Sequence, residues 1–127
     1  MQICEDTTNA TYSIVSYTSN SVMINHQVYT RSLIVAPHHL ILDWPLFSIN
    51  ELSLSTLQSL LDLNPEIILL GTGQTFKMPN PALWLNALPS KIGIEYMSTS
   101  SAIRTYAALS AEGRNVVAGL IFEINES

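Results

Sequence analysis

The pattern of apolar and polar positions divides the chain into a β-rich first half and a second half that alternates between strand and helix. In the first half, β-branched and aromatic side chains gather in short runs with Asn and Ser at the breaks, which is typical of strands joined by turns. These runs predict strands over residues 11–18, 21–25, 27–37 and 39–44. We expect the strands of this half to be antiparallel.

The second half begins with leucines at helical spacing, which indicate a helix that ends before Pro65. Ser55 with Gln58 fits a capping box for this helix, and Ser53 is a rival cap. The pattern then predicts a strand, a helix, a strand, a helix and a strand, over residues 66–71, 80–88, 92–97, 98–113 and 115–124. Strands joined by such helices pair in parallel through right-handed crossovers. We therefore expect an α/β fold: a single compact domain with a mixed central β-sheet, in which a β-rich N-terminal half precedes a β-α-β-α-β unit.

Length and composition agree with one globular domain. The 127 residues suit a single domain, and we assign residues 1–127 to it, with residues 1–10 as a flexible N-terminus. An apolar content of 47% is enough to build a core without disulfides or metal. The charged content of 12% is about half the usual value. So few charges indicate that a partner covers part of the surface.

Charge and the lengths of the apolar runs exclude several classes of partner. The net charge is −5 and the five basic residues are scattered, which argues against binding to nucleic acid or to an anionic membrane surface. No apolar run approaches the roughly 20 residues that span a bilayer. Cys4 is the only cysteine, and the first residues lack the features of a secretory signal or a transit peptide. We therefore predict a cytoplasmic protein.

The helix over residues 98–113 carries several of the few charges. At about 100° per residue, Tyr106 falls on the apolar core face, whereas Arg104 points nearly the opposite way, beside Ala108 and Ala111. Arg104 is therefore either a solvated side chain or the anchor of a contact face. Tyr106 is expected in the core rather than in catalysis.

The end of the same helix carries further polar residues. Thr105 and Glu112 share one flank, a pattern too weak to define a site. Gly113 is expected to stop the helix, and Arg114 to satisfy its terminal carbonyl groups.

Two segments could hold a small ligand. The Gly71-Thr72-Gly73 turn follows a predicted strand, but Phe76 stands where a dinucleotide-binding turn needs glycine, and no phosphate-binding loop follows. The turn still lies where open α/β sheets bind ligands, although its glycines could simply allow positive φ. The hydroxyl run 98–101 could bind an anion at a helix start or only cap the helix.

Other candidates for chemistry are weaker. His38, His39 and Asp43 do not form a recognisable metal-binding pattern, so neither a metal nor a cofactor is predicted. No Ser-His-Asp order or nucleophile elbow is present, and catalysis is unsupported.

The segment Leu70-Gly71-Thr72-Gly73 and the series Thr99, Arg104-Thr105-Tyr106 and Glu112-Gly113-Arg114 together resemble a known family. It is the family of small α/β domains that includes mitochondrial NADH:ubiquinone oxidoreductase (complex I) assembly factor 3 and an adipogenesis-associated domain protein. The resemblance covers residues 16–121. It implies one α/β domain with a mixed central sheet, no established reaction or cofactor, and a role in protein binding.

Two positions depart from the family pattern. Ala107 stands where members commonly have Asn, and Ile103 where they often have Cys. The lack of transit-peptide features favours a bacterial member of the family.

Two functions follow from these observations. The first is a non-catalytic protein-interaction or assembly-factor-like domain, with respiratory-complex components among the candidate partners. A homodimer is compatible with the apolar balance, and it could pair through strand 115–124 if that strand lies at an edge of the sheet. The alternative is a small-ligand or anion-binding domain that uses the Gly71–Gly73 turn and the helix start at 98–101. The candidate residues are Gly71, Thr72, Gly73, Thr99, Arg104, Thr105, Tyr106, Glu112 and Arg114.

Overall fold

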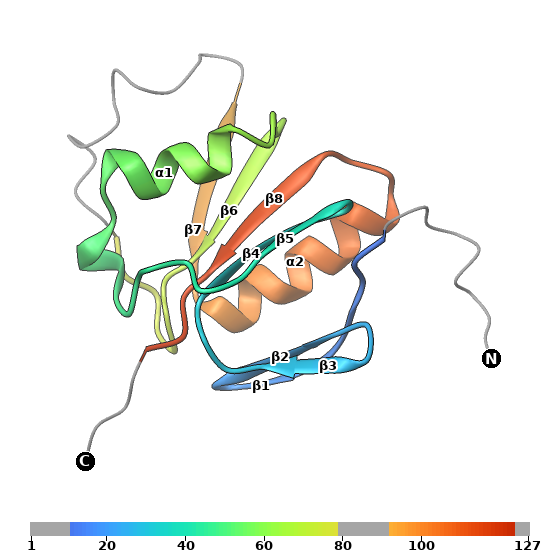
Figure 1. Cartoon of the computed structure of the whole chain (residues 1–127), viewed down its shortest axis with the longest axis horizontal. Coiled ribbons are helices and arrows are strands. Elements are labelled where there is room, and N and C mark those ends of the chain that lie inside the picture. Colours follow the sequence, from blue (N-terminus) through green and yellow to red (C-terminus); the bar gives the residue numbers. More distant parts are fainter. Residues whose placement is uncertain (1–10, 79–91, 124–127) are drawn as a thin grey trace.

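The computed structural model describes residues 11–78 and 92–123, which form two β-sheets and two α-helices (Figure 1). The predicted helix over residues 80–88 and the predicted flexible N-terminus over residues 1–10 lie outside this described part of the chain.

The first sheet is antiparallel and has the order β1-β2-β3. Its strands are β1 (Ile14–Thr18), β2 (Ser21–Ile24) and β3 (Gln27–Tyr29). The second sheet has the order β5-β4-β8-β6-β7. Its strands are β4 (Leu33–Ala36), β5 (His39–Ile41), β6 (Ile67–Gly71), β7 (Gly93–Met97) and β8 (Val116–Leu120).

The five-stranded sheet is mixed, as predicted. β4 runs antiparallel to β5 and β8, whereas β6 runs parallel to both β7 and β8. The β-rich first half thus supplies the antiparallel strands and the second half the parallel ones. The α/β fold class is confirmed.

The prediction of one strand over residues 27–37 is wrong, because β3 and β4 belong to different sheets. The chain turns between them, and the buried Ser32 holds the turn. Its hydroxyl donates to the carbonyl oxygen of Leu46 (2.6 Å) and accepts from the amide of Phe122 (3.0 Å). The predicted strand 39–44 is shorter too, because Asp43 has a φ of 58°.

The expectation that strand 115–124 could be an edge is also wrong. β8 lies between β4 and β6, and all five of its residues are buried. Its alternating side chains serve both faces of the sheet, since Val116 and Ala118 pack on one side and Val117 on the other.

One helix covers each face of the five-stranded sheet (Figure 1). α1 (Leu54–Leu61) packs on one face through Leu57 and Leu60, together with the 3-10 helix η2 (Ile49–Glu51). α2 (Thr99–Ala111) packs on the other face, and the three-stranded sheet lies on that same side, where Val22 and Ile24 of β2 join the core of α2.

The cap of α1 differs from the favoured prediction. Ser53, and not Ser55, is the N-cap: it has extended backbone angles and exchanges hydrogen bonds with Thr56. Ser55 already lies inside the helix, where its backbone cannot adopt the cap conformation.

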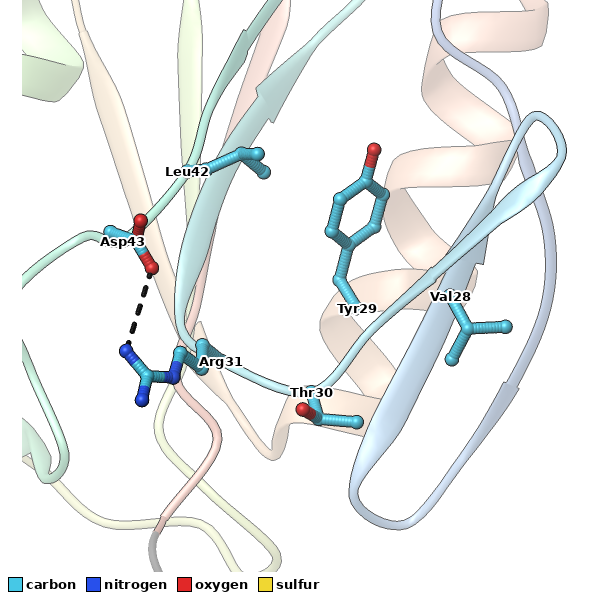
Figure 2. Close-up of a pocket in the computed structure, with 6 residues that line it drawn as sticks. All are labelled: Val28, Tyr29, Thr30, Arg31, Leu42 and Asp43. Carbon is cyan, nitrogen blue, oxygen red and sulfur yellow. Dashed lines mark ion pairs between the residues drawn. The ribbon is translucent and has the colours of Figure 1, made fainter.

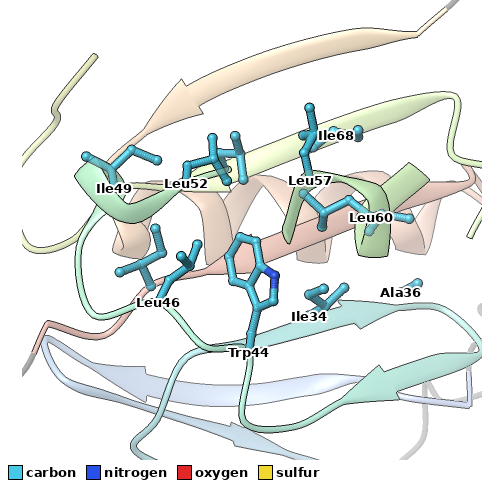
Figure 3. Close-up of a cluster of buried hydrophobic side chains, with 12 residues drawn as sticks. Ile34, Ala36, Trp44, Leu46, Ile49, Leu52, Leu57, Leu60 and Ile68 are labelled. Carbon is cyan, nitrogen blue, oxygen red and sulfur yellow. The ribbon is translucent and has the colours of Figure 1, made fainter. Parts of the chain in front are cut away.

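Trp44 fixes α1 on the sheet. Figure 3 shows its indole pointing toward Leu57 and Leu60 of α1. Its Nε1 donates to the carbonyl oxygen of Thr56 at 3.2 Å. The ring lies so close to Gly119 of β8 that an added Cβ would come within 2.8 Å of it.

Candidate functional site

The Gly71–Gly73 turn and the start of α2 lie directly against one another. The amide of Thr99 donates to the carbonyl oxygen of Gly73 at 2.8 Å, and the amide of Gly73 donates to Thr99 Oγ1 at 2.9 Å. A Cβ on Gly71 would lie 2.8 Å from Thr99 Cα. The two segments considered as a ligand site are thus one packed junction, in which Gly71 is needed for close approach.

The two threonine hydroxyls of this junction are already hydrogen-bonded inside the protein. Thr99 Oγ1 donates to the carbonyl oxygen of Ile121 at 2.7 Å. Thr72 Oγ1 donates to the carbonyl oxygen of Thr75 at 3.1 Å and accepts from the amide of Lys77 at 2.9 Å. Because a hydroxyl has one hydrogen to donate, neither retains a donor for a ligand. The geometry therefore gives the ligand-binding alternative less support.

A carboxylate does lie against this turn, and it belongs to the chain itself. Glu123 forms an ion pair with Lys77 Nζ at 2.6 Å, and its other oxygen accepts from the amide of Gln74 at 3.4 Å. A Cβ on Gly73 would come within 2.5 Å of the carboxyl carbon, and Gly73 has a φ of 120°. The turn therefore already contacts the Glu123 carboxylate, close to the place where the sequence suggested that an anion from outside the chain could bind.

Tyr106 and Thr105 serve the packing of α2. Tyr106 is fully buried, its hydroxyl donates to the carbonyl oxygen of Tyr12 at 3.4 Å, and burial raises its pKa far above the ordinary value, against a smaller lowering by Ser110. Its position in the core agrees with the sequence interpretation. Thr105 donates to Met97 Sδ of β7 at 3.6 Å.

The end of α2 is a Schellman motif. Gly113, with a φ of 81°, donates to Ser110, and the amide of Arg114 donates to Leu109 at 3.1 Å. Gly113 stops the helix as predicted, and Glu112 is its exposed C-cap.

The side chain of Arg114 does not bind the terminal carbonyl groups of α2, which was the expectation from the sequence. Its backbone amide satisfies a helix carbonyl group, but its Nε donates to Glu66 Oε1 at 2.9 Å, next to β6. The hydrogen bond from Arg114 lowers the pKa of the Glu66 carboxyl, as does the hydrogen bond from the amide of Asn115.

Arg104 lies on the exposed side of α2, in a groove between that helix and β1. Its Nη1 donates to the Tyr17 hydroxyl at 3.0 Å and its Nη2 to Ser101 Oγ at 3.1 Å. The groove has a volume of about 430 Å³, and we call it the Arg104 groove. It is lined by Ile14, Val15, Ser16, Tyr17, Ile103, Arg104 and Ala107.

The Arg104 groove combines apolar surface with an uncompensated charge. Val15 is 62% exposed and Tyr17 37% exposed. The other basic side chains of residues 11–78 and 92–123 each have a carboxylate partner: Arg31 with Asp43, Lys77 with Glu123, and Arg114 with Glu66. In that part of the chain, Arg104 alone has only neutral partners.

Two residues of the Arg104 groove are the positions at which this chain departs from the family pattern. These are Ile103 and Ala107, and both line the groove beside Arg104. Tyr17 was missed, because its contact with Arg104 joins residues 87 positions apart and no local pattern signals it.

A smaller pocket of about 210 Å³ lies between β3 and the residues that follow β5. Figure 2 shows Arg31 and Asp43 facing each other across its rim, 3.8 Å apart, with the ring of Tyr29 opposite Leu42. Among the described residues, Asp43 does not join His38 and His39 in a group of three or more side chains placed to hold a metal ion.

Neither α1 nor α2 is long and apolar enough to cross a membrane, and these are the only α-helices in the described part of the chain.

Comparison with known proteins places the chain in a family. The family described as protein of unknown function DUF498/DUF598 matches residues 14–121. The 13 kDa major membrane protein of Francisella tularensis subsp. holarctica is 30% identical over 120 residues, which cover 91% of this chain and 95% of that protein.

Two solved bacterial structures are similar over nearly their whole length. The NMR structure of a Xanthomonas campestris protein is 33% identical, with a TM-score of 0.80, and the match covers 94% of this chain and 90% of that one. The crystal structure of a Bordetella parapertussis protein is 30% identical, with a TM-score of 0.82 and coverage of 91% and 98%. These findings confirm the resemblance seen in the sequence: the chain belongs to the DUF498/DUF598 family.

Proposed function

We propose that this domain is a non-catalytic protein-interaction module, similar in role to an assembly factor, and that the Arg104 groove is its contact face. The observation that carries the proposal is the environment of Arg104. Its guanidinium is held in place by two neutral hydroxyls, while each of the other described Arg and Lys side chains forms an ion pair with a carboxylate of the same chain.

The chemistry of the groove suits a protein partner. An arginine has five N–H donors, and the bonds to Tyr17 and Ser101 use two of them. The remaining donors can bind a carboxylate, while the exposed Val15 offers apolar surface beside them. Arg and Tyr anchors next to apolar surface are typical of the residues that dominate binding energy at interfaces.

The class of partner follows from the family resemblance. Because one family member assists the assembly of respiratory complex I, we propose respiratory-complex components as the first candidates to test. A homodimer through the same groove is the other arrangement, and light scattering distinguishes the two.

Affinity purification from the native cell at natural expression tests the proposal. The Arg104→Glu variant is compared with wild type and with Arg31→Glu, which makes the same charge change at an exposed side chain away from the groove. We expect Arg104→Glu to reduce the captured partners at least tenfold while Arg31→Glu retains them, with both Tm values near that of wild type because surface substitutions are usually within about 0.5 kcal/mol. Equal recovery from all three chains, or a matching loss of partner and Tm in Arg104→Glu, would contradict the proposal.

The cellular location is tested in the same strain. We propose a cytoplasmic location from the sequence, whereas the Francisella relative is named as a membrane protein. Fractionation of wild type and Arg104→Glu is the measurement. Wild type in the soluble fraction supports the proposed location, and wild type in washed membranes contradicts it.

A further inference from the structure

β1 is an edge strand whose sequence contains no charge and no proline, and it borders the Arg104 groove. Within the described residues, the four edge strands are β1, β3, β5 and β7. β3 and β5 have three residues each, and β7 contains the charged Glu95, which are common ways to block an edge. β1 has five residues, Ile-Val-Ser-Tyr-Thr, with neither a charge nor a proline.

The irregularity of β1 shows which part of it could pair. A β-bulge lies between Ile14 and Ser16, and it protects the beginning of the strand against pairing, as short length protects β3 and β5. The regular part is therefore Ser16–Thr18, whose register with β2 is continuous. Antiparallel ladders turn half of the backbone N–H and C=O groups of an edge strand away from its partner. Tyr17 in this regular part is also the residue that contacts Arg104.

The helix beside this edge leaves room for another backbone. Ala107 and Ala108 of α2 are exposed, and Ala107 lines the Arg104 groove. Small side chains allow a neighbouring chain to approach a helix closely. Arg104 lies one turn before them and places a positive charge at the same side of the groove.

We propose that the Arg104 groove binds an extended segment of a partner protein, which adds as a fourth strand to β1 and places an Asp or Glu side chain on Arg104. This inference rests on the proposed interaction function and specifies how that function is carried out. Backbone hydrogen bonds to the edge supply affinity, as in other cases of strand addition, and alternate side chains supply specificity.

Strand geometry defines the segment further. Side chains two positions apart point to the same face and lie about 6.7 Å apart. One helical turn of α2 rises about 5.4 Å. An apolar side chain two positions from the acid therefore reaches the turn that carries Ala107 and Ala108. The expected motif is an acidic residue and an apolar residue separated by one position, in a β-prone segment.

Peptide selection tests the motif. Random dodecapeptides displayed on phage are selected against the immobilised full-length chain, and the enriched peptides are labelled and titrated by fluorescence anisotropy. We expect enriched peptides to carry an Asp or Glu in a β-branched context and to bind Arg104→Glu at least tenfold more weakly. The Arg31→Glu control should change the affinity less than twofold. Replacing the peptide's acid by Lys should restore binding to Arg104→Glu. Failure to enrich peptides, or enrichment of peptides without an acid, would overturn the proposal.

Amide hydrogen exchange of the ¹⁵N-labelled chain then tests strand addition itself. A bound peptide should slow exchange in β1 at least tenfold and leave β3, at the other edge of the same sheet, unchanged. Peptides that depend on Arg104 without protecting β1 would overturn strand addition and leave the proposed interaction function standing. Peptides that bind independently of Arg104 would count against both. A dimer in light scattering with β1 protected before any peptide is added would make a second copy the occupant, which also overturns the proposal.

Discussion

Replacing Thr99 by valine separates a structural role of this residue from a role in ligand binding. The two side chains have nearly the same shape, but valine lacks the hydroxyl. In the wild-type protein this hydroxyl accepts from the amide of Gly73 and donates to the carbonyl oxygen of Ile121. Both bonds are buried, so water cannot replace the lost partner.

The expected loss of stability follows from the two groups that lose their hydrogen-bond partner, the amide of Gly73 and the carbonyl oxygen of Ile121. A buried donor or acceptor left unsatisfied costs about 1–3 kcal/mol. Burying a methyl group instead of a hydroxyl offsets about 1 kcal/mol of this. We therefore expect Thr99→Val to lower the free energy of unfolding by about 3 kcal/mol, the centre of a range of about 1–5 kcal/mol. For a chain of this length, the central value lowers the Tm by roughly 9–15 °C.

Urea and thermal unfolding measure the change, and Thr99→Ser is the matched control. Serine keeps the hydroxyl and loses one buried methyl group, so it should cost only about 1 kcal/mol. A Thr99→Val chain as stable as Thr99→Ser would refute the structural interpretation. It would also restore Thr99 as a candidate ligand donor.

Two further predictions test the core and the charges. Gly119→Ala should lower the free energy of unfolding by about 1–3 kcal/mol, because the added Cβ would overlap the ring of Trp44. Gly93→Ala is the control, since its Cβ would meet open space, and it should change the free energy by no more than about 0.5 kcal/mol. Equal effects of the two substitutions in thermal denaturation would contradict the close contact between Gly119 and Trp44. The pKa of Glu66 is lowered from its ordinary value of 4.5 by Arg114, so the stabilisation is present above that value and is lost as the pH falls through the lower, folded-state pKa. The Tm difference between wild type and Arg114→Gln should accordingly shrink on acidification below pH 4.5, and a difference independent of pH would contradict the pairing.

Local patterns in the sequence were sufficient where a structure depends on neighbouring residues. Gly113 ends α2 as its position indicated, and Tyr106 lies in the core because its apolar neighbours share one helix face. β7 and β8, which α2 connects, both run parallel to β6, in agreement with the crossover that the sequence predicted.

Contacts between distant segments were beyond these patterns. The break between β3 and β4 depends on Ser32, whose partners Leu46 and Phe122 are 14 and 90 positions away. No glycine or proline marks the turn, so the run of β-branched residues looked continuous. Likewise, Tyr17 becomes a partner of Arg104 only once β1 lies over α2.

The ion pairs of this chain show which of its few charges connect parts of the fold. A charge that forms no such pair marks a surface that the fold itself does not need. Lys77 with Glu123 joins the turn after β6 to the segment after β8. Arg114 with Glu66 joins the end of α2 to the start of β6. Each of these pairs joins the segments that flank β6 and β8. Arg104 contacts only the hydroxyls of Tyr17 and Ser101, so its charge remains available to a partner. In a protein with so little charge, a cation beside the edge strand β1 without a carboxylate partner is the observation on which the proposed contact face rests.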